Sequence, residues 1–150
     1  MKVTINNKQY LATLTKTAEI NDRIKPGADY QCVVKSANAS GVIDYFYDTD
    51  EFTVEVKKFN ADDLDSGNAL FSVLRAFCFN NQAMLVSSEA LTQATGKAQF
   101  EKLMDTFEDD EQVNVEKTTT CGYSITLFDE EESFDNVEDF TIEEGKGLSK

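Results

Sequence analysis

The carboxylates of the C-terminal third are the most concentrated chemical groups in this sequence. Residues 105–144 contain fifteen acidic residues and one basic residue, Lys117. Carboxylates can bind hard cations, transfer protons, or present a negative surface to a basic partner. Apolar residues recur among these acids, which favours an ordered backbone over a disordered acidic tail. The candidate partner-binding residues are Asp105, Glu108, Asp109, Asp110, Glu111, Glu116, Asp129, Glu130, Glu131, Glu132, Asp135, Glu138 and Asp139.

Two short acidic loops are candidates for cation binding because their first acids have the spacing of an EF-hand loop. In the loop that begins at Asp48, Phe52 takes the fifth position and Thr53 replaces the glycine of the sixth. In the loop that begins at residue 63, Gly67 comes one place early and Leu74 stands where the bidentate glutamate belongs. We therefore expect no EF-hand and no metal ligands, while a calcium or magnesium site of another kind stays open as an alternative.

Catalysis is disfavoured because the sequence contains no histidine. This absence excludes triads that use imidazole, histidine metal sites and the usual proton-transfer group near neutral pH. The phosphate-binding patterns GxxxxGKS/T and GxGxxG are also absent from the sequence. A carboxylate pair for glycoside hydrolysis can be assembled from so many acids, but the same holds for almost any acidic protein. We expect a protein that is not an enzyme and has no cofactor.

The three cysteines, Cys32, Cys78 and Cys121, are an odd number at wide spacing, which predicts neither a disulfide framework nor a zinc site. Cys32 and Cys78 fall at apolar positions and are expected in the core. Cys121 falls in an expected turn, and we expect it to be inert because no histidine can activate it. The chain also lacks an apolar run of the roughly 18 residues that a membrane span requires. With no secretory signal pattern, these features predict a cytoplasmic protein.

The net charge of −14 is unevenly distributed along the chain. Residues 1–40 have six basic and three acidic side chains, a balance of +3, whereas residues 41–150 have eight basic and twenty-five acidic side chains, a balance of −17. A strongly negative field repels nucleic acid and anionic lipid and attracts basic surfaces. We therefore expect no direct contact with nucleic acid or membrane, and a basic protein surface as the partner.

The N-terminal half alternates apolar and polar residues in the manner of antiparallel strands. The first alternating segment is interrupted by Asn6 and Asn7, a pair that suits the positive φ angles of a tight hairpin turn. A strand at 30–35 follows, and strands at 42–47 and 52–59 form a second hairpin. Strict alternation along the last strand places Phe52, Val54, Val56 and Lys58 on one face and Thr53, Glu55, Lys57 and Phe59 on the other.

The apolar spacing becomes helical in the centre of the chain. A helix from Leu64 onward is expected to be the main packing element of the core, and Asn60 is the expected cap of the turn before it. A second helix is expected from about Ser88, broken or capped anew at Thr95 and Gly96. Its most amphipathic part contains Phe100, Leu103, Met104 and Phe107.

The remaining segments complete the predicted fold. Residues 83–86 fit either a strand or a buried turn, and residues 113–127 form a hairpin. Residues 134–142 fit a short amphipathic helix or a pinned tail, and residues 145–150 are expected to fray. We predict a single α+β domain over residues 1–150, with an antiparallel sheet from N-terminal and C-terminal hairpins packed against two amphipathic helices.

These features favour a non-enzymatic acidic binding protein. Acids three or four residues apart on a helix have Cβ atoms roughly 5–6 Å apart, and acids on one face of a strand are about 6.5–7 Å apart. DNA carries one charge per about 1.7 Å of its axis, so an ordered acidic surface can imitate a row of phosphates. We predict an inhibitor or DNA mimic that occupies the basic cleft of a nucleic-acid-binding protein, of the type that phages and other mobile elements use for counter-defence.

Two alternatives remain at the level of the sequence. The acidic surface can serve only to keep a small domain soluble. The chain can instead be a phage or plasmid structural or assembly protein that self-associates through its β-rich N-terminal half, residues 1–60, by pairing edge strands.

Overall fold

The computed structural model describes residues 1–83, 85–87, 94–110, 113–117, 123–127 and 136–145. The elements are β1 (Lys2–Ile5), β2 (Lys8–Ile20), β3 (Gly27–Lys35), β4 (Ser40–Asp48), β5 (Thr53–Ala61), α1 (Leu64–Asn80), β6 (Leu85–Ser87), α2 (Ala94–Asp105), β7 (Val113–Lys117), β8 (Tyr123–Leu127), β9 (Val137–Glu138) and β10 (Glu143–Glu144). The predicted helix start near Ser88 lies outside the described residues. No helix in these ranges is both long enough and apolar enough to cross a membrane.

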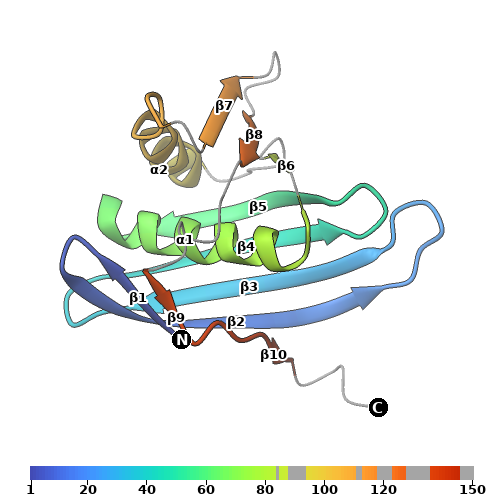
Figure 1. The fold of residues 1–150 in the computed structure, drawn as a ribbon, viewed down its shortest axis with the longest axis horizontal. Helices are drawn as coiled ribbons and strands as arrows, with labels where there is room; N and C mark the ends of the chain where they lie inside the picture. The colour runs from blue at the N-terminus through green and yellow to red at the C-terminus, as the bar shows by residue number, and fades with distance from the viewer. Residues whose placement is uncertain (84, 88–93, 111–112, 118–122, 128–135, 146–150) are drawn as a thin grey trace.

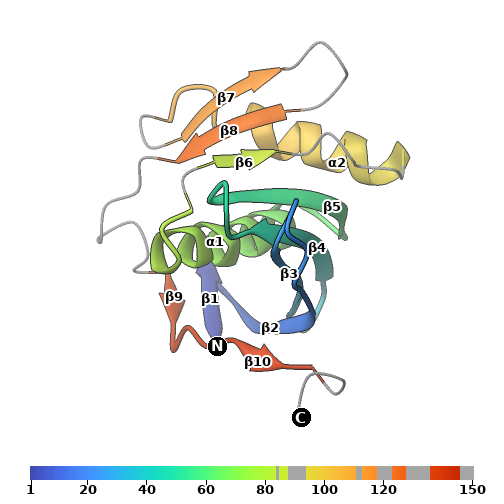
Figure 2. The ribbon, with the colours of Figure 1, turned by 90° about the vertical axis from the view of Figure 1, so that its right-hand side faces the viewer.

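A curved sheet joins the strands of the described residues in the order β7-β8-β6-β5-β4-β3-β2-β1-β9, with β10 beside β2. Its pairs are antiparallel except for β5 with β6 and β2 with β10. β5 and β6 are parallel neighbours, so the chain must return across one face of the sheet to connect them, and α1 forms this connection. Figure 2 shows β1 to β5 curling around α1. In Figure 1, α2 and the β7–β8 hairpin lie above this curled part and β10 lies below it, while Figure 2 shows β9 beside β1. The predicted α+β fold is confirmed.

The hairpin turn between β1 and β2 forms at the predicted asparagines. Asn6 and Asn7 have φ angles of 50° and 67°, as a two-residue turn that matches the twist of its strands requires. The turn is tied to the start of α1, because Asn6 Nδ2 and Lys8 Nζ donate to the Asp65 carboxylate at 2.9 and 2.8 Å. The first hairpin is therefore held against the central helix.

Strand β5 departs from strict alternation because its ladder with β4 contains a bulge. Adjacent residues of β4 pair with Val56 and Lys58, so Lys57 is an extra residue in β5. The bulge brings Phe59 to the same buried face as Val56. The prediction that Phe59 and Val56 lie on opposite faces is therefore wrong.

Helix α1 begins at the predicted residue but with a different cap. The carboxylate of Asp63 accepts a hydrogen bond from the backbone N–H of Ser66 at 2.8 Å, and the Ser66 hydroxyl accepts one from the backbone N–H of Asp63 at 3.1 Å. This reciprocal capping box satisfies two backbone donors that a helix start otherwise leaves free. The cap of the helix is thus Asp63. Asn60, which was expected to cap the turn before the helix, is instead a residue of β5 and pairs with Val42.

Replacing Asp63 with alanine is expected to lower the free energy of unfolding by about 1 kcal/mol, because the N-cap acceptor is lost. The measurement is equilibrium denaturation followed by far-ultraviolet circular dichroism. Asp63→Asn is the matched control, since asparagine caps about as well as aspartate. Equal losses in the two variants would contradict a capping role.

Phe77 is the centre of the contact between α1 and the sheet. Its ring is edge-on to three tyrosines, with centroid distances of 4.8 Å to Tyr30, 5.2 Å to Tyr45 and 5.3 Å to Tyr47. These tyrosines belong to β3 and β4, and all four rings are buried. The prediction that α1 is the main packing element is confirmed.

Helix α2 packs closely on β5 through its first turn. A Cβ atom added to Gly96 would be 2.3 Å from the backbone oxygen of Phe59. Nearby, the Gln99 side chain accepts a hydrogen bond from the backbone N–H of Ala61 at 2.8 Å. α2 begins at Ala94, next to the residues where a break or a new helix start was predicted, and the glycine permits close approach to the strand.

Residues 136–145 follow the edge formed by β1 and β2. β9 pairs with β1 and β10 pairs with β2, while Asn136 Nδ2 donates to Ser72 Oγ of α1 at 3.0 Å. Of the two predictions for this segment, the pinned tail is confirmed over residues 136–142. Gly145, where fraying was expected to begin, donates its N–H to the carbonyl of Lys16 at 2.8 Å; residues 146–150 lie outside the described residues.

Candidate acidic binding site

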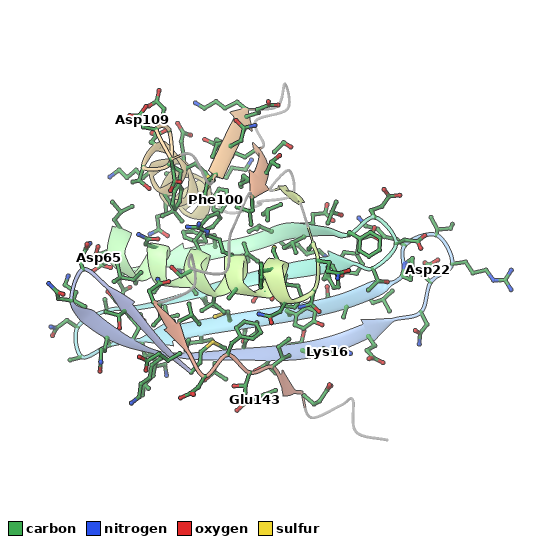
Figure 3. The ribbon with its side chains drawn as sticks, in the orientation of Figure 1. Lys16, Asp22, Asp65, Phe100, Asp109 and Glu143 are labelled. Atoms are coloured by element: carbon green, nitrogen blue, oxygen red, sulfur yellow. The ribbon has the colours of Figure 1, made fainter. Side chains whose placement is uncertain are left out.

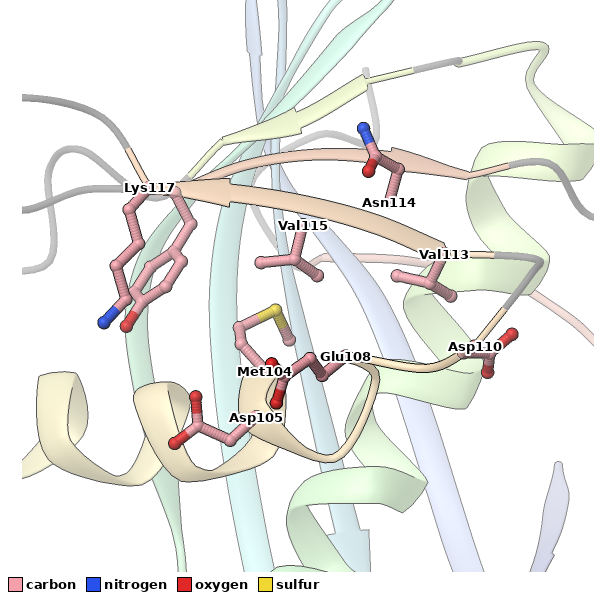
Figure 4. A pocket seen from close by; sticks show the side chains of 9 residues that line it. Met104, Asp105, Glu108, Asp110, Val113, Asn114, Val115 and Lys117 are labelled. Atoms are coloured by element: carbon pink, nitrogen blue, oxygen red, sulfur yellow. The ribbon is translucent and has the colours of Figure 1, made fainter.

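A cleft of about 530 Å³ separates the end of α2 from β7 (Figure 4). Its lining consists of Met104, Asp105, Glu108, Asp110, Val113, Asn114, Val115, Lys117 and Tyr123. Three of these residues are carboxylates from the predicted partner-binding set. They come from the end of α2 and the turn after it, and they face a strand that follows them in the chain.

Buried aromatic contacts hold both walls of the cleft. Beyond the end of α2, the ring of Phe107 is 4.9 Å from the ring of Phe71 in α1, measured between centroids. On the other wall, Tyr123 of β8 lies 5.8 Å from Phe100 of α2. Met104, which lines the cleft, is itself buried. The acids at the rim are therefore carried on backbone that is anchored to the core.

The acids occupy the end of α2 in positions that oppose local stability. Asp105 is the last residue of the helix, and its carbonyl accepts a hydrogen bond from the N–H of Glu108 at 3.4 Å. A second tight turn follows, in which Asp110 donates its N–H to the carbonyl of Phe107 at 3.1 Å. The C-terminal end of a helix is already negative, so carboxylates there cost roughly 0.3–1 kcal/mol each. Folding alone does not favour acids at these positions.

The electrostatic balance of the cleft is negative. Its lining includes three carboxylates and the ammonium group of Lys117, which lies 4.0 Å from Glu101 at an exposed position. Such an exposed pair contributes little to stability. Burial raises the pKa of Tyr123, and the carboxylates of Glu101 and Asp105 raise this pKa further. The Tyr123 hydroxyl thus remains a hydrogen-bond donor at neutral pH.

A second cavity, of about 450 Å³, lies where α2 meets the end of β5 and the start of α1. Its acids Asp62 and Asp63 accept hydrogen bonds from the backbone N–H groups of Ser40 and Ser66. Asp105 borders this cavity as well as the cleft. Movement of α2 would therefore change both cavities together.

The structure separates the predicted partner-binding acids into two groups at opposite ends of the sheet. Asp105, Glu108 and Asp110 line the cleft. Asp109, in the turn after α2, and Glu116, in β7, are exposed. Glu138 and Asp139 belong to the tail on the β1 edge. In Figure 3, Asp109 marks the first group, and Glu143, which follows Glu138 and Asp139 in the tail but is not a predicted binding residue, marks the position of the tail. The other predicted acids, Glu111, Asp129, Glu130, Glu131, Glu132 and Asp135, lie outside the described residues.

Sequence reasoning did not identify Asn114, Lys117 and Tyr123 as part of the site. Strand alternation indicates only that Tyr123 belongs to the apolar face of its hairpin. In the observed register Lys117 is opposite Tyr123. These two residues flank the predicted turn at 118–122, so the predicted hairpin could have identified the pair. The position of α2 beside β7 is a tertiary contact that the sequence pattern does not specify.

The acidic loops that were considered for cation binding use their carboxylates within the fold. Asp48 Oδ1 accepts hydrogen bonds from the N–H groups of Asp50 and Glu51 at 2.9 and 3.0 Å. In the other loop, Asp63 caps α1 and Asp65 binds the first hairpin turn. Within the part of the chain that the structure describes, no three aspartate, glutamate, cysteine or histidine side chains gather as a metal site.

The cysteines of the described residues are buried. Cys32 belongs to β3, and burial raises the pKa of its thiol to about 12. Cys78 is buried in α1, so the prediction that these two cysteines are core residues is confirmed. Cys121 lies outside the described residues.

Carboxylates line the cleft, and the chain has no histidine. An open acidic cleft beside a strand suits cationic groups such as lysine and arginine side chains. Comparisons of this chain with protein-family models, curated proteins and solved structures found no match.

Proposed function

We propose that the protein is a non-enzymatic binding protein that acts as an inhibitor or DNA mimic. The acidic surface around its cleft would bind the basic cleft of a nucleic-acid-binding protein. The supporting observation is that Asp105, Glu108 and Asp110 line one cleft on anchored backbone. The proposed setting is counter-defence by a phage or another mobile element in the cytoplasm. This setting is an analogy of class and follows from the charge of the protein.

The positions of the acids support mimicry over simple solvation. Acids that serve only solubility can be anywhere on the surface, whereas here they cluster at a helix end that disfavours them. Their neighbours Phe107 and Met104 are buried, so the backbone that carries the carboxylates is anchored to the core. Charges on an anchored backbone lose less entropy on binding than charges on a mobile tail do.

Removal of the charges at the end of α2 should weaken binding without unfolding the protein. In the triple variant Asp105→Asn, Glu108→Gln, Asp109→Asn, we expect affinity for the captured partner to fall about tenfold, at roughly 0.5 kcal/mol for each exposed charge. The folded state should be unchanged or slightly more stable, because the helix end loses unfavourable charge.

The experiment begins with capture of proteins from a cytosolic lysate on the immobilised full chain. Retained proteins are released by salt or by competing DNA. The affinity of each released protein for the original chain and for each variant is then measured by calorimetry. The matched control is Glu138→Gln, Asp139→Asn, Glu143→Gln, which removes the same charge at the opposite edge of the sheet. Asparagine at position 139 tolerates the φ angle of 59° found there. Equal weakening by the two triple variants would show that only net charge matters, and no weakening by either would refute the proposal.

Self-association through the β-rich N-terminal half remains the alternative function. The tail already pairs with part of the β1 and β2 edge, so a second copy that used this edge would first have to displace β9 and β10. Sedimentation velocity at increasing concentration tests this alternative, since a strictly monomeric profile would argue against it.

A further inference from the structure

The edge of β7 is the starting observation. β7 is the first strand of the sheet order and pairs with β8 on one side. Among the described residues, no strand pairs with its other side. In an antiparallel ladder, alternate residues direct both N–H and C=O away from the partner strand. β7 therefore presents backbone donors and acceptors along its outer edge.

The acidic cleft lies against one face of β7. Val113, Val115 and Lys117 share that face and line the cleft, together with Asn114 and with Tyr123 of β8. In Figure 4 the strand runs along the cleft opposite Asp105 and Glu108. A strand added beside β7 would direct every second side chain to this same face, toward the carboxylates.

The two ends of the sheet differ in how their edges are covered. At the β1 and β2 end, the tail pairs with Lys2 and Val3 through β9 and with Thr15 and Lys16 through β10. Proteins commonly cover or charge exposed edges because a free edge invites pairing with another chain. At the other end, the charge beside the edge is negative. Negative charge repels acidic copies of this chain and attracts an extended segment that is basic.

We propose that β7 accepts an extended basic segment of the partner as an additional strand, with lysine or arginine side chains reaching Asp105 and Glu108 across the cleft. This inference rests on the function proposed above and specifies how the partner binds. Backbone hydrogen bonds along β7 would supply affinity, while the acids would select basic residues at every second position of the partner.

The geometry limits the length and chemistry of the partner segment. The five residues of β7, at about 3.3 Å per residue, extend roughly 16 Å, so a segment of about five residues fills the edge. Basic extended arms of this kind occur in nucleic-acid-binding proteins. An arm bound here could not contact DNA at the same time.

The test uses the full chain labelled with ¹⁵N and the peptide acetyl-Lys-Val-Lys-Val-Lys-Val-Lys-amide. Two further peptides have the same charge but are N-methylated either on the three valines or on the inner lysines. Only alternate N–H groups of an added strand face the protein. We expect one methylated peptide to bind at least about tenfold more weakly than the parent, through loss of two or three hydrogen bonds, and the other to bind like the parent. Amide protons of β7 should exchange more slowly when the parent peptide is bound.

The outcomes separate this inference from the proposed function. If both methylated peptides bind like the parent while the Asp105, Glu108 and Asp109 triple variant weakens all three, strand addition is overturned and acidic recognition of a basic partner stands. If the parent peptide does not bind at low salt but captured proteins still depend on the three acids, strand addition is again overturned alone. If neither peptides nor captured proteins respond to the triple variant, both proposals fail.

Discussion

Alanine in place of Gly96 will destabilise the protein by about 2 kcal/mol, although the same change stabilises most helices by up to about 1 kcal/mol. The added Cβ would lie 2.3 Å from the backbone oxygen of Phe59. A backbone atom cannot move aside as a flexible side chain can, so α2 must shift away from β5. The hydrogen bond from Ala61 to Gln99 and the packing of Phe100 on Phe59 would be strained together.

Denaturant unfolding of Gly96→Ala measures this loss, with Lys97→Ala as the control in the same helical turn. Lys97 is exposed, so its replacement should change stability by no more than about 0.5 kcal/mol. The shift of α2 should also speed amide exchange in β7, because both walls of the cleft depend on this helix. An increase in stability in Gly96→Ala would show that α2 does not pack on β5 as described.

Alanine in place of Phe77 will lower the free energy of unfolding by about 3–5 kcal/mol. The substitution leaves a cavity beneath α1 and removes three edge-on contacts with Tyr30, Tyr45 and Tyr47. Domains of this size have a total stability of about 5–15 kcal/mol, so the variant is expected to be partly unfolded near physiological temperature. The burial of all four rings is the reason for the large effect.

Thermal and denaturant unfolding of Phe77→Ala is compared with that of Phe79→Ala. Phe79 is on the same helix and is 47% exposed, so a much smaller loss is expected there. Phe77→Leu fills part of the space and should give an intermediate loss, which keeps the prediction testable if the alanine variant does not fold. Similar losses for Phe77→Ala and Phe79→Ala would contradict the central role of Phe77.

The segments that were predicted correctly are those in which local pattern and tertiary role agree. The asparagine pair 6–7 has few alternatives to a tight turn, and the apolar spacing after Leu64 is compatible only with a buried helix. The pattern failed where one residue changes the geometry of its neighbours. Lys57 is an ordinary strand residue in sequence, yet as a bulge it moves Phe59 to the other face. Gly96 lies in the first turn of α2, at the predicted break or new helix start, but only the structure shows that it also permits a close contact with Phe59.

The candidate site was predictable in composition but not in arrangement. The acids at the end of α2 were identified as a group, and three of them line the cleft. Their separation from Glu138 and Asp139 depends on the tail pairing with β1. Two-residue strands contain too little alternation for a sequence pattern to detect, since strand prediction uses runs of four to eight residues.

The tail along β1 and β2 also imposes an order on the assembly of the fold. Synthesis proceeds from the N-terminus, so β2 is complete long before residues 136–145 exist to cover it. During that interval the growing chain has an uncovered edge on its least acidic portion, residues 1–40, where charge repulsion between copies is weakest. The newly made chain is therefore most prone to self-association before β9 and β10 are synthesised, and these two strands protect the edge once the protein has folded.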